Sequence, residues 1–260
     1  MPLRTGSERA RYDELAAADG DAAGSHFTKT GPRFRLRLVT RQAARLSPAS
    51  VVDLGCGDGV VLAAVSRALP DAACAGLDWS LVALRRARAR GCNVAAADLE
   101  RPPLRSGTFD LAVSSQVLEH VADPGSALCQ ARALLRPGGR LLLTVPTADW
   151  HKVLVGLFAP GRVTYLDPTH RREWAVRRFG RFGHVRELKL LVESAGFEVE
   201  SLRGIFYGVW RLEQPLDRWL TPDGAAEGCL LAADRLLGAL PWLRGAGKYL
   251  MLVARRKERE

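Results

Sequence analysis

Short apolar runs alternate with helical patterns between residues 50 and 146. Each run ends at a polar or glycine position, which is typical of buried strands in a parallel sheet that helices cover on both faces. Helices are predicted between these runs, at 59–69, 81–90 and 125–135. The predicted strands are 50–54, 73–78, 92–98, 109–115 and 140–146. This alternation predicts an α/β fold made of βαβ units.

The pattern changes on both sides of this unit. Before it, the apolar and polar residues of 32–46 are arranged as in one amphipathic helix, which we expect to dock on the sheet. After residue 147 the alternation stops for about forty residues, which is long for a connection in a compact α/β domain. It resumes with a helix that ends at Gly196, a strand, and a last strand at 248–256. We expect a single domain whose parts are a helical extension (1–46), an α/β core (47–146), and an irregular segment with the C-terminal strands (147–260).

Composition adds few constraints. The apolar content of 47% and charged content of 25% are those of an ordinary globular chain. The five cysteines show no metal-ligand spacing, so we expect free thiols, no metal site and a cytoplasmic protein. No secretory signal and no membrane span are predicted. The net charge of +10 comes mainly from arginine and is interpreted as solvated helix surface rather than as a nucleic-acid site.

The stretch VVDLGCGDGVVL (51–62) carries the first candidate chemistry. Its glycines, Gly55, Gly57 and Gly59, follow a predicted strand and precede a predicted helix. Asp78 closes the second predicted strand, at the place where an acid can accept hydrogen bonds from ribose hydroxyls. Asp53 lies at the carboxyl end of the first predicted strand and Asp98 closes the third, so the three carboxylates are predicted to meet at one edge of the sheet.

Two nucleotide-binding patterns do not fit this turn. The dinucleotide fingerprint needs GxGxxG, and here the third glycine comes one position early. Asp58 stands inside the turn, where its charge disfavours a pyrophosphate and favours a ligand with ammonium or sulfonium charge. The Walker pattern fails because no GK[ST] follows.

The successive motifs VVDLGCGDG, GLDWS, AADLERPPL, FDLAVSSQVLEHVADP and LLRPGGRLLLTVP resemble those of class I S-adenosylmethionine-dependent methyltransferases. They are most similar to the type 11 small-molecule branch, over roughly residues 47–146. The resemblance implies S-adenosylmethionine as the cofactor. It also implies a Rossmann-like, seven-stranded and mostly parallel sheet whose last strand is antiparallel.

The resemblance also implies a role for individual residues. Asp53 and the three glycines would hold the methionine end, and Asp78 the ribose, with Trp79 against the adenine face. Asp98 and the Leu99 backbone would contact the adenine edge. The residues implied beside the sulfonium are Ser115 and Gln116.

A hydroxyl acceptor needs a base to take its proton, and histidines are the candidates. We rank His170 first, His120 second and His184 third. His120 belongs to a motif shared by members with different substrates, so a structural or cofactor-orienting role is an equal alternative. His170 lies in YLDPTHRREW, a loop dense in polar groups where Arg171 and Arg172 could clamp an anionic acceptor.

The acceptor is predicted to be a small molecule, with an aromatic ring, a sugar or an anionic group. Five of the six tryptophans follow residue 149, where the acceptor wall is expected: Trp150, Trp174, Trp210, Trp219 and Trp242. Residues 226–243 form an amphipathic pattern with Leu230, Ala233, Leu237 and Leu240 on its apolar stripe and Asp234 off it. We expect this helix to pack on the domain, with a second copy or peripheral membrane contact as the alternatives.

The leading prediction is therefore a methyltransferase that modifies a small molecule, at a hydroxyl oxygen, in secondary-metabolite, quinone or glycan biosynthesis. The alternatives are a tRNA or rRNA methyltransferase and a non-catalytic S-adenosylmethionine-binding regulator. The fourth predicted strand ends in SSQVLEH instead of the [DN]PP[YF] used for base amines, which disfavours nucleic acid. An intact turn with all three carboxylates disfavours a regulator.

Overall fold

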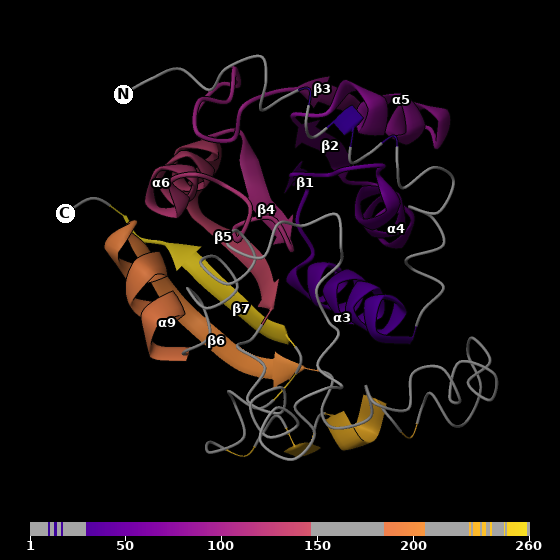
Figure 1. The fold of residues 1–260 in the computed structure, drawn as a ribbon. Helices are drawn as coiled ribbons and strands as arrows, with labels where there is room; N and C mark the ends of the chain where they lie inside the picture. Colours follow the sequence, from indigo (N-terminus) through magenta and orange to yellow (C-terminus); the bar gives the residue numbers. More distant parts are fainter. Residues whose placement is uncertain are drawn as a thin grey trace, which may run out of the picture.

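Seven strands form one mixed sheet in the order β3-β2-β1-β4-β5-β7-β6 (Figure 1). The computed structural model describes residues 30–146, 185–205 and 249–258, with scattered positions between 10 and 17 and between 229 and 247. The strands are β1 (Ser50–Leu54), β2 (Ala73–Asp78), β3 (Val94–Ala96), β4 (Phe109–Ser115), β5 (Leu135–Pro146), β6 (Phe197–Ile205) and β7 (Tyr249–Arg256).

The first five strands run parallel to one another, and β7 lies between β5 and β6 and runs antiparallel to both. The predicted α/β fold with an antiparallel last strand is therefore confirmed. In this topology β1 and β4 are neighbours at the centre of the sheet, and the strand order changes from one side of β1 to the other between them. A crevice at the carboxyl ends of such central strands is where open α/β sheets bind ligands.

Helices cover both faces of the sheet, and each face has its own apolar core. The successive residues Leu141, Leu142 and Leu143 of β5 point to alternate faces, as the period of a strand requires. Packing on one side comes from α6 and α9, and on the other from α3 and α4, while α5 packs on β2 and β3 (Figure 1). The helices are α3 (Thr30–Leu46), α4 (Val60–Ala68), α5 (Leu81–Ala89), α6 (Pro124–Leu134) and α9 (Val185–Ser194).

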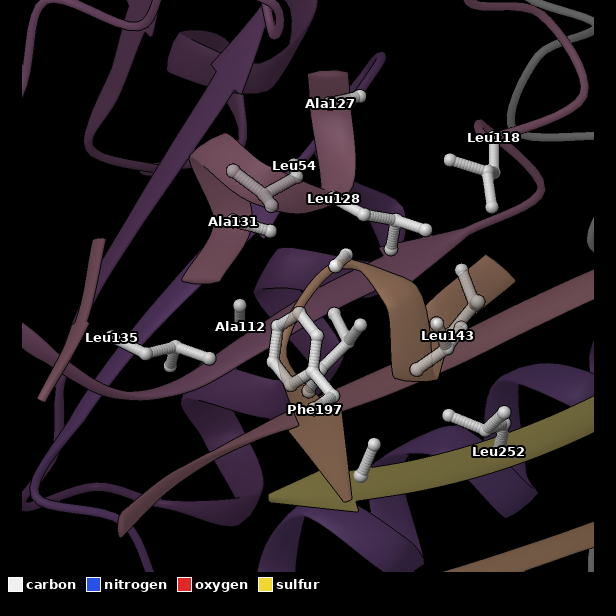
Figure 2. Packing of buried hydrophobic residues seen from close by; sticks show 14 of the residues in the cluster. Leu54, Ala112, Leu118, Ala127, Leu128, Ala131, Leu135, Leu143, Phe197 and Leu252 are labelled. Atoms are coloured by element: carbon white, nitrogen blue, oxygen red, sulfur yellow. The ribbon is translucent and has the colours of Figure 1, made fainter. Parts of the chain in front are cut away.

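Figure 2 shows the core beneath α6 and α9. The ring of Phe197, at the start of β6, is fully buried and lies among leucines and alanines of α6 and the central strands. Leu128 and Ala131 extend from α6 toward it, and Leu143 and Leu252 extend from β5 and β7. Burying a phenylalanine ring in this way contributes about 1.5–3 kcal/mol to stability.

Two strands differ from the sequence prediction. The third was expected over 92–98 but pairs only over Val94–Ala96, because it lies at the edge of the sheet with one neighbour. The fifth was expected to start at 140 after a turn, yet β5 starts at Leu135, which pairs with Phe109. The pairing resumes with Arg140 beside Leu111, so the expected turn is a bulge inside the strand.

The predicted stripe of the 226–243 helix is wrong at two positions. Asp234 is buried at 3% exposure, and Ala233 is exposed. Leu231, three residues before Asp234 and therefore on the same helical side, joins the core formed by α3 and β7. The expected packing on the domain is present through Leu231, but the helix is rotated so that an acid faces inward. Among the described residues, no helix is long and apolar enough to span a membrane.

Candidate active site

Residues 55–59 form the tight turn that leads from β1 into α4. Its glycines have positive φ angles of 79° at Gly55, 52° at Gly57 and 80° at Gly59. The N–H groups of Gly55 and Cys56 both donate to the carbonyl of Leu77 near the end of β2, at 2.7 and 2.9 Å. The turn is therefore fixed to the carboxyl edge of the sheet.

Two of the glycines are also required by close packing. A Cβ at Gly59 would lie 2.9 Å from the Cβ of Ala87 in α5, and a Cβ at Gly55 would lie 2.5 Å from the methyl carbons of Val117. Side chains other than hydrogen would collide there, and a positive φ is itself strained for them. Helix α5 and the segment after β4 thus pack directly against the turn.

Asp78, the last residue of β2, is hydrogen-bonded to the same turn. Its Oδ2 accepts from the N–H of Gly57 at 2.8 Å, and its Oδ1 accepts from the N–H of Ser80 at 2.8 Å. Burial raises the pKa of the Asp78 carboxyl, and these backbone donors oppose that rise. The carboxylate is held in one orientation at the end of the strand, with lone pairs left for a further donor.

Asp53 lies in the interior, two residues before the turn, at 2% exposure. Its Oδ2 has no hydrogen-bond partner among the residues that the structure describes. Burial, and then the charge of Asp78, raise the pKa of Asp53 to about 7. A buried acid with an unsatisfied oxygen is costly unless a ligand or ion satisfies it, so Asp53 is a candidate functional position.

The interpretation given to Asp58 is wrong. Its carboxylate lies 3.1 Å from a guanidinium nitrogen of Arg90, and the Arg90 Nε also donates to the Asp58 carbonyl at 3.0 Å. Because this ion pair links the turn to the end of α5, the charge of Asp58 is balanced within the protein. The turn still differs from the dinucleotide pattern in its glycine spacing, but Asp58 does not choose the ligand.

The remaining predicted residues follow β3 and β4. Asp98 accepts from the N–H of Glu100 at 3.0 Å, and the Ser115 hydroxyl lies 3.0 Å from that of Thr144. Gln116 has a positive φ of 60°, uncommon for a residue with a side chain, and its Nε2 is buried without a partner among the described residues. Strained backbone of this kind, which costs on the order of 1–3 kcal/mol, clusters at ligand sites.

A cavity of about 170 Å³ opens at this edge of the sheet. Five residues predicted to bind the cofactor line it together with His120: Gly55, Asp78, Trp79, Leu99 and Gln116. Sequence reasoning missed the other three lining residues, Ala97, Val117 and Val121. Their apolar side chains carry no motif; the one related signal is Gly55, whose lack of a side chain permits the close approach of Val117.

His120 lies beside a buried acid that sequence reasoning also missed. Its Nε2 is 4.0 Å from Oε1 of Glu119, and the imidazole is 32% exposed where Glu119 is 2% exposed. Burial raises the pKa of Glu119 to about 8, although the charge of Arg35 in α3 opposes this. The Arg35 guanidinium lies over the ring of Tyr249, 4.9 Å from its centre. His120 therefore stands between an apolar cavity and a buried ionisable cluster.

Several predicted residues lie outside the described part of the chain. They are His170 and His184, Arg171 and Arg172, and the five tryptophans after residue 149.

Comparison with known proteins identifies the family. A family model described as a methyltransferase domain matches residues 27–202. A probable S-adenosylmethionine-dependent methyltransferase of Mycolicibacterium smegmatis is 34% identical over 212 residues, which span 79% of this chain and 71% of that protein. The chain belongs to the class I S-adenosylmethionine-dependent methyltransferases, as its motifs predict, and it is an enzyme of that class.

Two further likenesses are informative. A ubiquinone biosynthesis O-methyltransferase of Thiobacillus denitrificans is 28% identical over 226 residues, 81% of this chain and 93% of that one. A methyltransferase solved in complex with the Trm112 methyltransferase activator of Haloferax volcanii shares the fold, with a TM-score of 0.60, 20% identity and coverage of 97% and 98% of the two chains. Another curated relative is longer, and the chain spans only 49% of its length.

The residues present fit S-adenosylmethionine. The ligand combines an adenosine with a methionine tail that carries ammonium and sulfonium charge, so it offers donors and positive charge. The site offers an acceptor at Asp78, a flat apolar surface at Trp79 and Leu99, and buried polar atoms of Asp53 and Gln116 that no described residue satisfies. Such atoms are usually satisfied by a ligand or a bound water.

Proposed function

We propose that this methyltransferase moves the methyl group of S-adenosylmethionine to a hydroxyl oxygen of a small-molecule acceptor, in secondary-metabolite, quinone or glycan biosynthesis. The cavity at the carboxyl edge of the sheet, with His120 in its wall, is the observation that carries this proposal. The similarity to a ubiquinone biosynthesis O-methyltransferase supports an oxygen acceptor. All five cysteines are free, which supports a reducing compartment, the cytoplasm.

The proposed cofactor site follows the sheet edge from β1 to β4. Asp53 and the backbone of Gly55, Gly57 and Gly59 hold the methionine end. Asp78 accepts from the ribose hydroxyls with Trp79 against the adenine, and Asp98 and Leu99 contact the adenine edge. Ser115 and Gln116 flank the sulfonium, where the cofactor supplies a methyl group to an aligned nucleophile.

His120 is our proposal for the base in the described part of the site, because it lines the cavity and is partly exposed. It would take the acceptor's proton as the oxygen attacks, or orient the cofactor. His170 remains a prediction for the same role. If His120 is the base, His120→Gln lowers kcat by about 10²–10⁴-fold while the affinity for S-adenosylmethionine stays within twofold. A variant that keeps full turnover would contradict the assignment.

The acceptor can be identified directly. The enzyme is incubated with cell extract and methyl-labelled S-adenosylmethionine, and labelled products are resolved by mass spectrometry. The proposal expects label in a low-molecular-weight compound, on oxygen, and labelling slower by about 10²–10⁴-fold with His120→Gln if His120 is the base. Label only on a nitrogen or carbon atom would overturn the oxygen assignment.

Nucleic acid is the second candidate, and the net charge of +10 is the observation that favours it. Labelled tRNA or rRNA in the same incubation, with binding that weakens steeply as salt is raised, would establish it in place of a small molecule.

A further inference from the structure

A carboxylate from the N-terminal extension reaches the candidate cofactor site. Oδ1 of Asp13 accepts from the hydroxyl of Ser80 at 2.6 Å and from the N–H of Val82 at 3.2 Å. Ser80 is the N-cap of α5, and it is buried. These partners lie 67 and 69 positions away in the sequence, so the contact ties the extension to the core.

Ser80 connects this contact to the proposed ribose acid. Its N–H donates to Oδ1 of Asp78, and the other oxygen of Asp78 accepts from the N–H of Gly57, both at 2.8 Å. A continuous chain of hydrogen bonds therefore runs from Asp13 through Ser80 and Asp78 to the glycine turn. Fully connected networks of this kind hold each member in one orientation.

Asp13 also helps to cap α5, because its Oδ1 accepts from the N–H of Val82 in the first turn of that helix. The hydroxyl oxygen of Ser80 already accepts from the N–H of Ala83 at 3.2 Å, which is the usual N-cap bond. Asp13 adds a negative charge beside another acid, and this charge contributes to the raised pKa of Asp78. The positive end of the α5 dipole offsets part of this repulsion, and a ligand that donates hydrogen bonds would offset more of it.

We propose that Asp13 is a positioning residue for the cofactor site: through Ser80 it fixes the Asp78 carboxylate and couples cofactor binding to anchoring of the N-terminal extension. The inference rests on the proposed function, because it takes Asp78 as the ribose acceptor. Coupling is reciprocal, so bound cofactor must also strengthen the attachment of the extension.

The test compares Asp13→Asn with Glu14→Gln. Glu14 is the exposed neighbour, so its variant removes the same charge without touching Ser80. Calorimetric titration of the full chain with S-adenosylmethionine and with S-adenosylhomocysteine is expected to show both affinities falling by about fivefold or more for Asp13→Asn, and unchanged for Glu14→Gln. Equal losses for the two ligands indicate positioning, since the homocysteine form lacks the sulfonium charge.

Two further measurements keep the proposal falsifiable if Asp13→Asn is poorly folded. Hydrogen exchange over residues 10–17 is expected to slow when the cofactor is added to the wild type, and not to slow in Asp13→Asn. The double variant with Ser80→Ala is expected to bind no more weakly than Ser80→Ala alone, because Asp13 acts on Asp78 only through Ser80 in this proposal.

Several results would overturn the inference. In the titrations, these are wild-type affinity in Asp13→Asn, an equal loss of affinity in Glu14→Gln, or a loss of affinity for S-adenosylmethionine alone. Hydrogen exchange over residues 10–17 that does not change when the cofactor is added, or additive losses of affinity in the double variant, would do the same. Asp78→Ala separates this failure from a failure of the proposed function. If Asp78→Ala weakens binding while Asp13→Asn does not, only the role of Asp13 falls; if Asp78→Ala binds as well as the wild type, the ribose assignment falls.

Discussion

Burial raises the pKa of two carboxyl groups near the cavity into the neutral range. Asp53 lies beneath the glycine turn and has a pKa of about 7, and Glu119 lies beside His120 and has a pKa of about 8. Each has an oxygen without a hydrogen-bond partner in the described part of the chain. The protonation of such acids responds to nearby charge and to pH in the neutral range, so each of them gives a prediction about a single residue.

Asp53 predicts a pH dependence of cofactor binding. A positively charged ligand favours the ionised acid, so binding releases a proton below pH 7, and affinity rises with pH up to about 7 and then levels off. At pH 6 the affinity is expected to be about tenfold below the plateau. Calorimetry between pH 5.5 and 8.5, in buffers of different ionisation enthalpy, measures both quantities. Asp53→Asn should flatten the profile, and a pH-independent affinity in the wild type would contradict the assignment.

Glu119 predicts a pH dependence of stability. Its pKa is about 8 in the folded chain and near 4.5 when unfolded, so the folded state holds the extra proton between these values. The free energy of unfolding therefore falls as pH rises from about 4.5 to 8, by at most about 1.4 kcal/mol per pH unit from this group. Urea unfolding at pH 5.5, 7 and 8.5 should show a shallower fall for Glu119→Gln. If the free energy of unfolding falls equally with pH in the wild type and in Glu119→Gln, the prediction is wrong.

At the scale of elements, the site depends on how closely α5 and the segment after β4 approach the glycine turn. The turn is fixed to β2 by two backbone hydrogen bonds and to α5 by the Asp58–Arg90 ion pair. Exposed ion pairs contribute little, typically 0–1 kcal/mol, so close packing at Gly59 is the stronger restraint. The position of α5 and the geometry of the turn therefore depend on each other.

Gly59 and Gly91 form a matched pair that tests this statement. Both have a φ near 80°, but a Cβ at Gly91 meets nothing within 4 Å, whereas a Cβ at Gly59 collides with Ala87. Gly91→Ala should lower the free energy of unfolding by about 1–2 kcal/mol, the cost of the left-handed backbone. Gly59→Ala should lose about 1–3 kcal/mol more and bind cofactor more weakly. Equal losses in chemical denaturation would mean that the approach of α5 is not the restraint.

The sequence predicts elements better than it predicts contacts between them. The strands at 50–54, 73–78 and 109–115 were predicted to the residue, because each apolar run ends at a polar side chain or directly before a glycine. Asp58 and Asp234 were misjudged for another reason. Their surroundings are set by Arg90 and by the rotation of a helix, which spacing along the chain does not encode. The hydrogen bond between Asp13 and Ser80 could not be predicted from the sequence either, since the partners lie 67 positions apart.

At the scale of the molecule, one sheet brings the proposed cofactor residues together from sequence positions far apart. β1, β2, β3 and β4 are adjacent and parallel, so Asp53, Asp78, Asp98 and Gln116 lie at or just after strand ends along the same edge. β7 and β6, which pair antiparallel to each other, extend the sheet beyond β5 and contribute residues to the core beneath α9. We therefore propose that the described core binds the methyl donor.

The central claim is that this edge binds S-adenosylmethionine through Asp78. Calorimetric titration of the wild-type chain and of Asp78→Ala with S-adenosylmethionine at pH 8 tests it most directly, with Asp110→Ala, an acid at the opposite end of β4, as the control. We predict saturable one-to-one binding to the wild type and to Asp110→Ala, and at least tenfold weaker binding to Asp78→Ala. Binding to Asp78→Ala as tight as to the wild type would contradict the account.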